Sequence, residues 1–228
     1  MPDLTVRLEC VFNEVQIARR FVGEGRVLDV GSDHGMLACH CLEKNIADSV
    51  VCTDIHESPA RRSSRLLSDY GFDSRSSVLV TDGLDGVKIL PGDIIVIAGM
   101  GGLNIIDILT RMTASADARV LPKIAIVLQS QKSANLVREF VCAKGFDIQG
   151  ESVCNDRNLY YSIMRLTYTG ESTKLSDKEL YYGPRLLEQQ GDETVRKYFR
   201  HLDEVYAVRS RSDKRIRALI EGRIANAD

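Results

Sequence analysis

Short apolar runs alternate with amphipathic stretches over the first two thirds of the chain. Apolar residues at helical spacing predict a helix over residues 4–22, and Gly23 follows as its end. Five apolar runs separated by helical stretches predict strands: RVLDVG, SVVCTDI, SSVLVTDG, GDIIVIAGMGG and KIAIVLQS. Strands that are apolar throughout and alternate with helices are typical of a parallel sheet buried on both faces. The pattern therefore predicts an α/β fold.

The alternation changes after the fifth run. Residues 146–168 predict two strands around the polar turn Asn155–Asn158, so an antiparallel hairpin would close the sheet. The composition becomes polar near Gly170, and beyond Pro184 two short apolar stripes predict a helical hairpin or two helices packed on the main domain. We therefore expect two parts, residues 1–170 and residues 171–228.

Composition and charge narrow the class of protein. The 228 residues include 44% hydrophobic and 27% charged side chains, as in ordinary globular proteins. The formal charge of −2 excludes a general basic field for nucleic acid, so any basic surface must be local. The six cysteines form no C-x-x-C pair, which favours buried thiols over a disulfide framework or a metal site. With neither a secretory signal nor a bilayer-spanning run, the sequence predicts a cytoplasmic protein.

A glycine turn after the first strand is the first candidate site. Gly31, Asp33 and Gly35 lie where open parallel sheets bind ligands, at the carboxyl end of a strand. Gly31 permits a tight turn and a close approach to a ligand. Asp54 ends the second strand, 23 residues after Gly31, where a carboxylate accepts from the hydroxyls of an adenosine ribose. The alternative for Asp54 is a solvated acid at a strand end.

The spacing of this turn selects among adenosine cofactors. A dinucleotide site needs G-x-G-x-x-G, whereas this loop is G-x-D-x-G, and its carboxylate would repel a pyrophosphate. S-adenosylmethionine has no phosphate and carries a sulfonium and an ammonium, which suit an acidic loop. Asp82, after the third strand, is a candidate acceptor for the adenine amine or an ordinary turn residue. The glycines of Gly99–Gly102 would form a loop at the end of the fourth strand, which would let a cofactor and a flat base lie against backbone; the alternative is a tight turn into the next helix.

The strings VLDVGSDHGMLA, TDG and IVIAGMGGLNIIDIL are similar to those of the bacterial TrmK-like tRNA methyltransferases. Members methylate N1 of the adenine at tRNA position 22 with S-adenosylmethionine. The resemblance implies a class I (Rossmann-like) S-adenosylmethionine-dependent methyltransferase domain followed by a C-terminal helical, coiled-coil-like domain. It implies tRNA as the partner, with no membrane, no metal and no obligate protein partner.

The resemblance implies the catalytic residue, and the strand ends, glycines and basic residues supply the other candidates. The aspartate of the S-D-H string, here Asp33, is the candidate catalytic residue. The candidate cofactor-binding residues follow the first four strands: Asp29, Gly31, Ser32, His34, Asp54, Ile55, Thr81, Asp82, Gly83, Ala98, Gly99, Met100 and Gly101. The candidate substrate-binding residues are Gly102, Gln129, Gln131, Tyr160, Arg61, Arg196, Lys197 and Arg200. Where the family usually has L-Q-P-N, this chain has Leu128–Gln131, which alters the segment expected to position the base.

Adenine N1 carries its own lone pair, so a strong base is not needed. Methylation creates a cation over N1 and N6, and Asp33 could accept from N6–H and stabilise that charge. His34 could hold Asp33 or the substrate backbone, or it could cap the following helix. Basic residues exceed acidic ones by five over residues 196–217, which predicts a phosphate-contacting face or an ordinary solvated helix. Two rivals remain: a methyltransferase of another RNA site or a small molecule, and a non-catalytic RNA-binding protein that keeps the cofactor fold.

Overall fold

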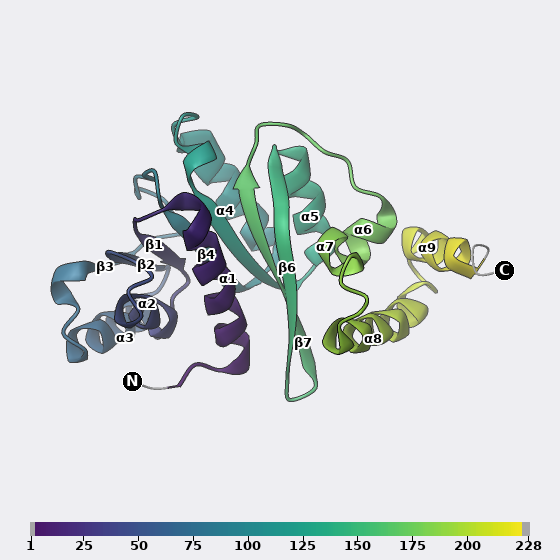
Figure 1. Cartoon of the computed structure of the whole chain (residues 1–228), viewed down its shortest axis with the longest axis horizontal. Coiled ribbons are helices and arrows are strands. Elements are labelled where there is room, and N and C mark those ends of the chain that lie inside the picture. Colours follow the sequence, from purple (N-terminus) through teal and green to yellow (C-terminus); the bar gives the residue numbers. More distant parts are fainter. Residues whose placement is uncertain (1–2, 225–228) are drawn as a thin grey trace.

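A seven-stranded sheet forms the centre of the computed structural model, which describes residues 3–224, with side chains as far as residue 221. The strand order is β3-β2-β1-β4-β5-β7-β6 (Figure 1). The first five strands are parallel, and β7 is antiparallel to both β5 and β6. Their bounds are β1 Val27–Val30, β2 Val50–Asp54, β3 Ser76–Val80, β4 Ile94–Gly101, β5 Ala125–Lys132, β6 Phe146–Asp156 and β7 Leu159–Tyr168.

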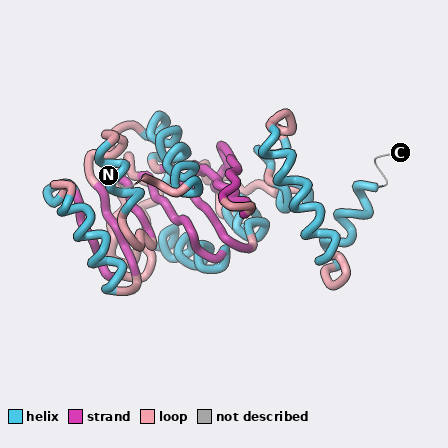
Figure 2. The backbone as a smooth tube through the Cα atoms, turned by 90° about the horizontal axis from the view of Figure 1, so that it is seen from below, coloured by secondary structure: helices cyan, strands magenta, loops and turns pink. Residues whose placement is uncertain are grey.

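Helices cover both faces of the sheet (Figure 2). One core packs the sheet against α1 (Val6–Val22), α2 (Met36–Glu43) and α3 (Glu57–Asp69). The other packs it against α4 (Gly102–Ser115) and α5 (Ala134–Ala143). Two short 3₁₀ helices, η1 (Asp73–Arg75) and η2 (Leu121–Lys123), complete the connections. The apolar central strands follow from this double cover, since a strand buried on both sides has no polar face.

The last quarter of the chain forms helices beside the β6–β7 edge of the sheet (Figure 1). They are α6 (Asp177–Tyr182), α7 (Pro184–Leu187), α8 (Glu193–Arg209) and α9 (Lys214–Ile224). Ser176 begins α6 with a reciprocal capping box to Glu179. A separate apolar cluster, which includes Tyr182, Tyr206 and Ile216, packs these helices together. That separate cluster agrees with the expected division of the chain, which stays a prediction.

The predicted α/β architecture is confirmed, with two local differences. The glycines expected to form a loop belong to β4 as far as Gly101, where the pairing with β5 is irregular near Met100. The fifth strand, predicted to end at Ser130, continues through Gln131 to Lys132. Both strands continue because backbone pairing depends little on side chains. Within residues 3–224, no helix has the length and apolar character needed to cross a bilayer.

Candidate active site

A cavity of about 360 Å³ opens at the carboxyl ends of β1, β2, β3 and β4. This is the edge at which open parallel sheets bind ligands. We call it the adenosine cavity. Seven of the predicted cofactor residues line it: Gly31, Asp54, Ile55, Thr81, Asp82, Gly83 and Met100. Val30, Thr53, Asn104, Asp107 and Ile108 complete the lining.

Gly31 makes the floor of this cavity possible. Its φ is +71°, and its N–H donates to the carbonyl oxygen of Thr53 at 2.8 Å. A Cβ at this position would lie 2.3 Å from Cε of Met100. A larger residue would therefore be strained in its backbone and would push Met100 aside, which accounts for the glycine that the sequence analysis singled out.

Asp54 presents a carboxylate to the adenosine cavity. Its Oδ1 accepts from the backbone N–H of His56 at 3.0 Å. Within the described residues it forms no ion pair, and the neighbouring Ile55 is 59% exposed. A carboxylate with free lone pairs beside an apolar side chain suits a ribose and its attached base.

Asp82 lies in an acidic cluster around Arg111. The Arg111 guanidinium is 3.0 Å from Asp82, 2.6 Å from Asp85 and 3.2 Å from Asp107. Asp82 Oδ1 is therefore engaged by a cation that the sequence analysis missed. Helix α4 supplies Arg111, 29 residues beyond Asp82, so no local spacing announces the pair. The cluster keeps the acidic wall partly neutralised beside the cavity.

Asp33 lies outside the adenosine-cavity lining, two residues beyond Gly31. Its φ of +50° is uncommon for a residue with a side chain, and conformations of that kind gather at functional sites. The carboxylate is 61% exposed and accepts from Nη2 of Arg62 at 2.7 Å. Nε2 of His34 lies 3.5 Å from its other oxygen. Helix α2 has Gly35 as its N-cap and no side-chain cap, so the His34 side chain does not cap it, and its role beside Asp33 stays a prediction.

Asp29 lies beneath the glycine turn and is buried. Burial raises its pKa to about 7, although the N–H of Ala38 and the charge of Arg7 act to lower it. Ser32 lies in the glycine turn itself, where its hydroxyl pairs with that of Ser63 at 3.0 Å. The Asp29 carboxyl is thus poised to ionise when a cation arrives nearby.

Arg7, which the sequence analysis did not select, reaches this end of the sheet from α1. Its Nη1 donates to Oε1 of Gln129 at 3.1 Å, and the same oxygen accepts from the N–H of Gly99 at 3.1 Å. The Arg7 guanidinium also lies against Gly99, since a Cβ added at Gly99 would be 3.2 Å from Nη1 of Arg7. The link spans 122 residues along the chain, so only the fold reveals it.

Two predicted substrate residues have no free surface in this structure. Gln129 is fully buried, and its Nε2 donates to the carbonyl oxygen of Ser130, so both ends of its amide are used internally. Gly102 is packed closely, since a Cβ there would lie 2.7 Å from the carbonyl oxygen of Lys132. Direct contact of either residue with a substrate stays a prediction, and the contacts in this structure favour a positioning role. Ala98 and Gly101, from the same strand end, are half-buried.

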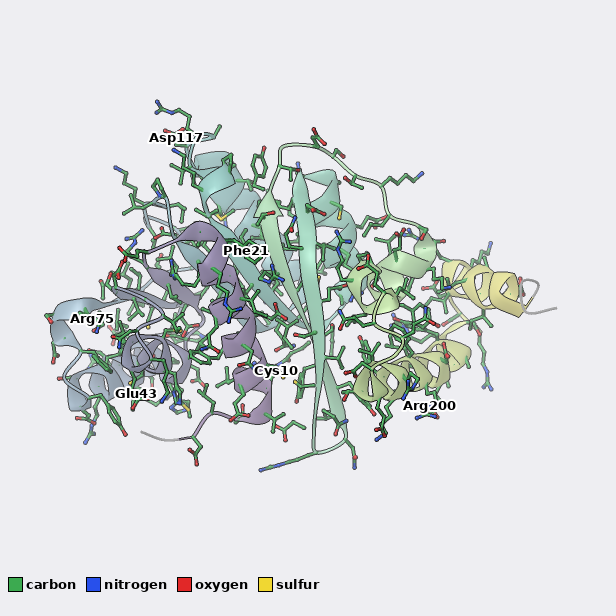
Figure 3. The ribbon with its side chains drawn as sticks, in the orientation of Figure 1. Cys10, Phe21, Glu43, Arg75, Asp117 and Arg200 are labelled. Carbon is green, nitrogen blue, oxygen red and sulfur yellow. The ribbon has the colours of Figure 1, made fainter. Side chains whose placement is uncertain are left out.

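The predicted basic residues do not form one patch. Arg61 pairs with Glu57 on α3 at 3.2 Å, whereas the others lie on α8 at the far edge of the sheet (Figure 1). Lys197 pairs with Glu193 at 2.6 Å. Arg196 donates to backbone carbonyls before its own helix, and Arg200 projects into solvent (Figure 3). Gln131 and Tyr160 lie together in a second groove beside α8. Within residues 3–224, no cluster of His, Cys, Asp and Glu could hold a metal ion.

Comparison with known proteins decides the family. The sequence model of the family described as tRNA (adenine(22)-N(1))-methyltransferase matches residues 27–224. The chain belongs to this family. The tRNA (adenine(22)-N(1))-methyltransferase of Bacillus subtilis is 28% identical over 159 residues, which are 67% of this chain and 65% of that protein.

Two solved structures share the fold of this tRNA (adenine(22)-N(1))-methyltransferase family member. A Streptococcus agalactiae protein of the NADB-Rossmann superfamily has a TM-score of 0.77 at 26% identity, covering 98% of this chain and 95% of that one. Streptococcus pneumoniae Sp1610 in complex with S-adenosyl-L-methionine has a TM-score of 0.78 at 24% identity, covering 96% and 99%. Together with the family match, they confirm the predicted enzyme class and Rossmann-like fold.

Proposed function

We propose that this tRNA methyltransferase transfers the methyl group of S-adenosylmethionine to adenine N1 at position 22, with Asp33 as its catalytic residue. The observation that carries this assignment is the exposed Asp33 carboxylate, which is held in a left-handed turn two residues from the cavity-lining Gly31. The family supplies the reaction, and the glycine turn supplies an exposed carboxylate beside the cavity.

The adenosine cavity fits this cofactor by its chemistry. Asp54, Asp82 and Asp107 would repel a pyrophosphate, whereas S-adenosylmethionine carries no phosphate. Asp54 binds the ribose hydroxyls, and Gly31 admits the ligand close to the backbone. Asp29 attracts the ammonium, and Arg7 binds the carboxylate at the other end of the amino acid. The cofactor's sulfonium supplies an electrophilic methyl group.

Asp33 acts on the base and not on the cofactor. Adenine N1 attacks with its own lone pair, so the developing positive charge spreads over N1 and N6. Asp33 accepts from N6–H through an oxygen that Arg62 does not occupy, which orients N1 and stabilises that charge. Gln129 holds Arg7 and the N–H of Gly99, and so fixes the strand end on which the base lies.

Methyl transfer to unmodified tRNA tests the proposal. Labelled S-adenosylmethionine, bulk unmodified tRNA and separation of the product nucleosides would reveal 1-methyladenosine. Asp33→Asn should lower kcat about 100-fold, the effect of removing one charge-stabilising group. Asp73→Asn, an exposed acid before β3, is the matched control and should act as wild type. Full turnover by Asp33→Asn would contradict its role, and label in another nucleoside or none would overturn the substrate.

The remaining assignments follow from this reaction. Because tRNA is the substrate, we propose that the protein works in the cytoplasm. We also propose that residues 1–170 carry methyl transfer and that residues 171–228 form a helical domain that contacts tRNA. A small-molecule methyltransferase is the alternative, and it would leave deletion of phosphate-binding cations without effect on turnover.

A further inference from the structure

A second groove, of about 460 Å³, lies between α8 and the carboxyl end of β5. It shares no lining residue with the adenosine cavity. The strands place the two sites close together, because Met100 of β4 pairs with Ser130 of β5, and Gly101 pairs with Lys132. One wall of the groove runs along α8 from Tyr198 to Arg209, about 16 Å at the rise of an α-helix.

Three aromatic rings meet in this groove. Tyr160 comes from β7, and its ring centroid lies 5.3 Å from that of His201, with 31° between the planes. The centroid of the Tyr160 ring lies 5.7 Å from that of Tyr198, which is one turn before His201 on α8. Tyr198 is buried, Tyr160 is half-buried and His201 is exposed. A planar ligand can therefore stack at the open end of an aromatic platform that is already fixed in place.

Ser130 adds a polar group that has no partner. The residue is only 7% exposed, and its hydroxyl has no hydrogen-bond partner in the described structure. A buried hydroxyl in that state is costly unless a ligand or water completes it.

The groove is also cationic. Lys132 ends β5, Arg209 ends α8, and both are exposed. Neither forms an ion pair within residues 3–221, and the lining includes no acidic residue. The chain has a formal charge of −2, so this is a local departure from its overall balance. Two unpaired cations beside flat rings suit the phosphate and base of one nucleotide.

We propose that this groove binds an unpaired nucleotide of the tRNA, next to the adenine that is methylated. Its base stacks on Tyr160 and His201, Ser130 donates to or accepts from the base edge, and Lys132 and Arg209 hold its phosphate. The inference rests on the proposed function, because it assigns a second contact for the same substrate. In this proposal helix α8 forms one wall of the site that binds the tRNA nucleotides around the methylated adenine. The helical segment is then part of the substrate site and not a separate RNA-binding domain.

Steady-state kinetics with unmodified tRNA test the groove. His201→Ala should raise KM for tRNA about tenfold through lost stacking, with kcat and KM for S-adenosylmethionine unchanged. Ser130→Ala should raise KM for tRNA roughly fivefold without lowering Tm, because removal of an unpartnered hydroxyl does not destabilise the fold. Arg209→Gln should reduce the slope of log KM against log salt by about 0.7–0.9.

Lys123→Gln, an exposed cation before the opposite end of β5 and outside this groove, is the matched control and should change none of these values. If the three groove variants behave as wild type while wild type methylates tRNA, the inference is overturned and the proposed function stands. The inference also fails if Arg200→Gln, on the outer side of α8, weakens tRNA binding and Arg209→Gln does not. If wild type binds S-adenosylhomocysteine but modifies no tRNA, the proposed function fails first.

Discussion

The Arg62 guanidinium on α3 lies 2.7 Å from the carboxylate of Asp33 in the glycine turn. The pair is exposed, with side-chain exposures of 43% and 61%, so water and salt weaken it. Because the pair is weak, tRNA can replace it: Arg62 can bind a tRNA phosphate while Asp33 accepts a hydrogen bond from the adenine amine. The two residues therefore have separable tasks, although they touch.

Arg62→Gln should separate those tasks. Loss of a phosphate-binding cation should raise the KM for tRNA several-fold. It should also reduce the slope of log KM against log salt concentration by about 0.7–0.9. The kcat at saturating tRNA should not fall, because Asp33 keeps its carboxylate. Steady-state kinetics at three salt concentrations would measure this, with Arg75→Gln as a control far from the turn. A fall in kcat like that of Asp33→Asn would show that Arg62 orients Asp33 during the reaction.

Asp54→Asn should weaken the cofactor. A carboxylate that accepts from two hydroxyls contributes about 1.5–3 kcal/mol, so affinity for S-adenosylhomocysteine should fall about 10- to 100-fold. Asp54 forms no ion pair in the described structure, so Tm without ligand should change little. Calorimetric titration gives the affinity, and Asp73→Asn serves as the control. Unchanged affinity would mean that Asp54 is only a solvated strand end.

The strands and the glycine turn were predictable because they depend on local pattern. Apolar runs buried on both faces mark the sheet, and Gly31 marks a backbone that needs a positive φ. Asp54 follows from its position at a strand end. The predicted hairpin turn is also confirmed, since Arg157 and Asn158 adopt positive φ between β6 and β7.

The contacts that give the site its character were not predictable, because they join distant segments. Arg7 meets Gln129 across 122 residues, and Arg62 meets Asp33 across 29. The loop expected at Gly99–Gly102 proved to be a strand end and a helix start, and the strand predicted to end at Ser130 continues to Lys132. At both places the neighbouring backbone overrides composition. No pattern in the sequence marks Ser130 as a buried hydroxyl without a partner.

Asp29 predicts a pH dependence for cofactor binding. Burial raises its pKa to about 7, so the carboxyl is protonated below that pH in the free protein. The ammonium of the bound ligand favours the ionised form, so affinity should be full above pH 7 and fall by at most about tenfold per unit as the pH drops below 7. Titration of S-adenosylhomocysteine from pH 5.5 to pH 8.5, chosen as roughly one and a half units on either side of that pKa, measures this.

The same titration with the Asp29→Asn variant tests whether Asp29 causes the pH dependence. The variant should bind more weakly above pH 7 and lose the pH dependence, whereas Asp73→Asn should keep the wild-type curve. The free energy of unfolding of the unliganded protein should change with pH in the opposite direction to the ligand affinity. The folded-state pKa exceeds the ordinary value of 3.8, so Asp29 makes the free protein less stable as pH rises from 3.8 to about 7. A flat wild-type affinity curve would place the ammonium elsewhere.

Arg138 and Glu151 predict how the helical segment is attached. Arg138 on α5 donates to Glu151 on β6 at 2.8 Å, with both side chains buried, and also to the carbonyl oxygen of Leu180 on α6 at 2.8 Å. Glu151 in turn accepts from the N–H of Arg185 on α7 at 3.0 Å.

Glu151→Gln leaves a buried guanidinium without its counter-charge, so the free energy of unfolding should fall by about 3–5 kcal/mol. Urea unfolding followed by circular dichroism would measure the loss, and Glu193→Gln, which breaks an exposed pair, should leave the transition unchanged. Because the pair joins α5 and β6 to α6 and α7, hydrogen exchange in the variant should quicken first over residues 177–209. Faster exchange confined to the central strands would contradict this attachment and place the pair's effect in the core of the sheet.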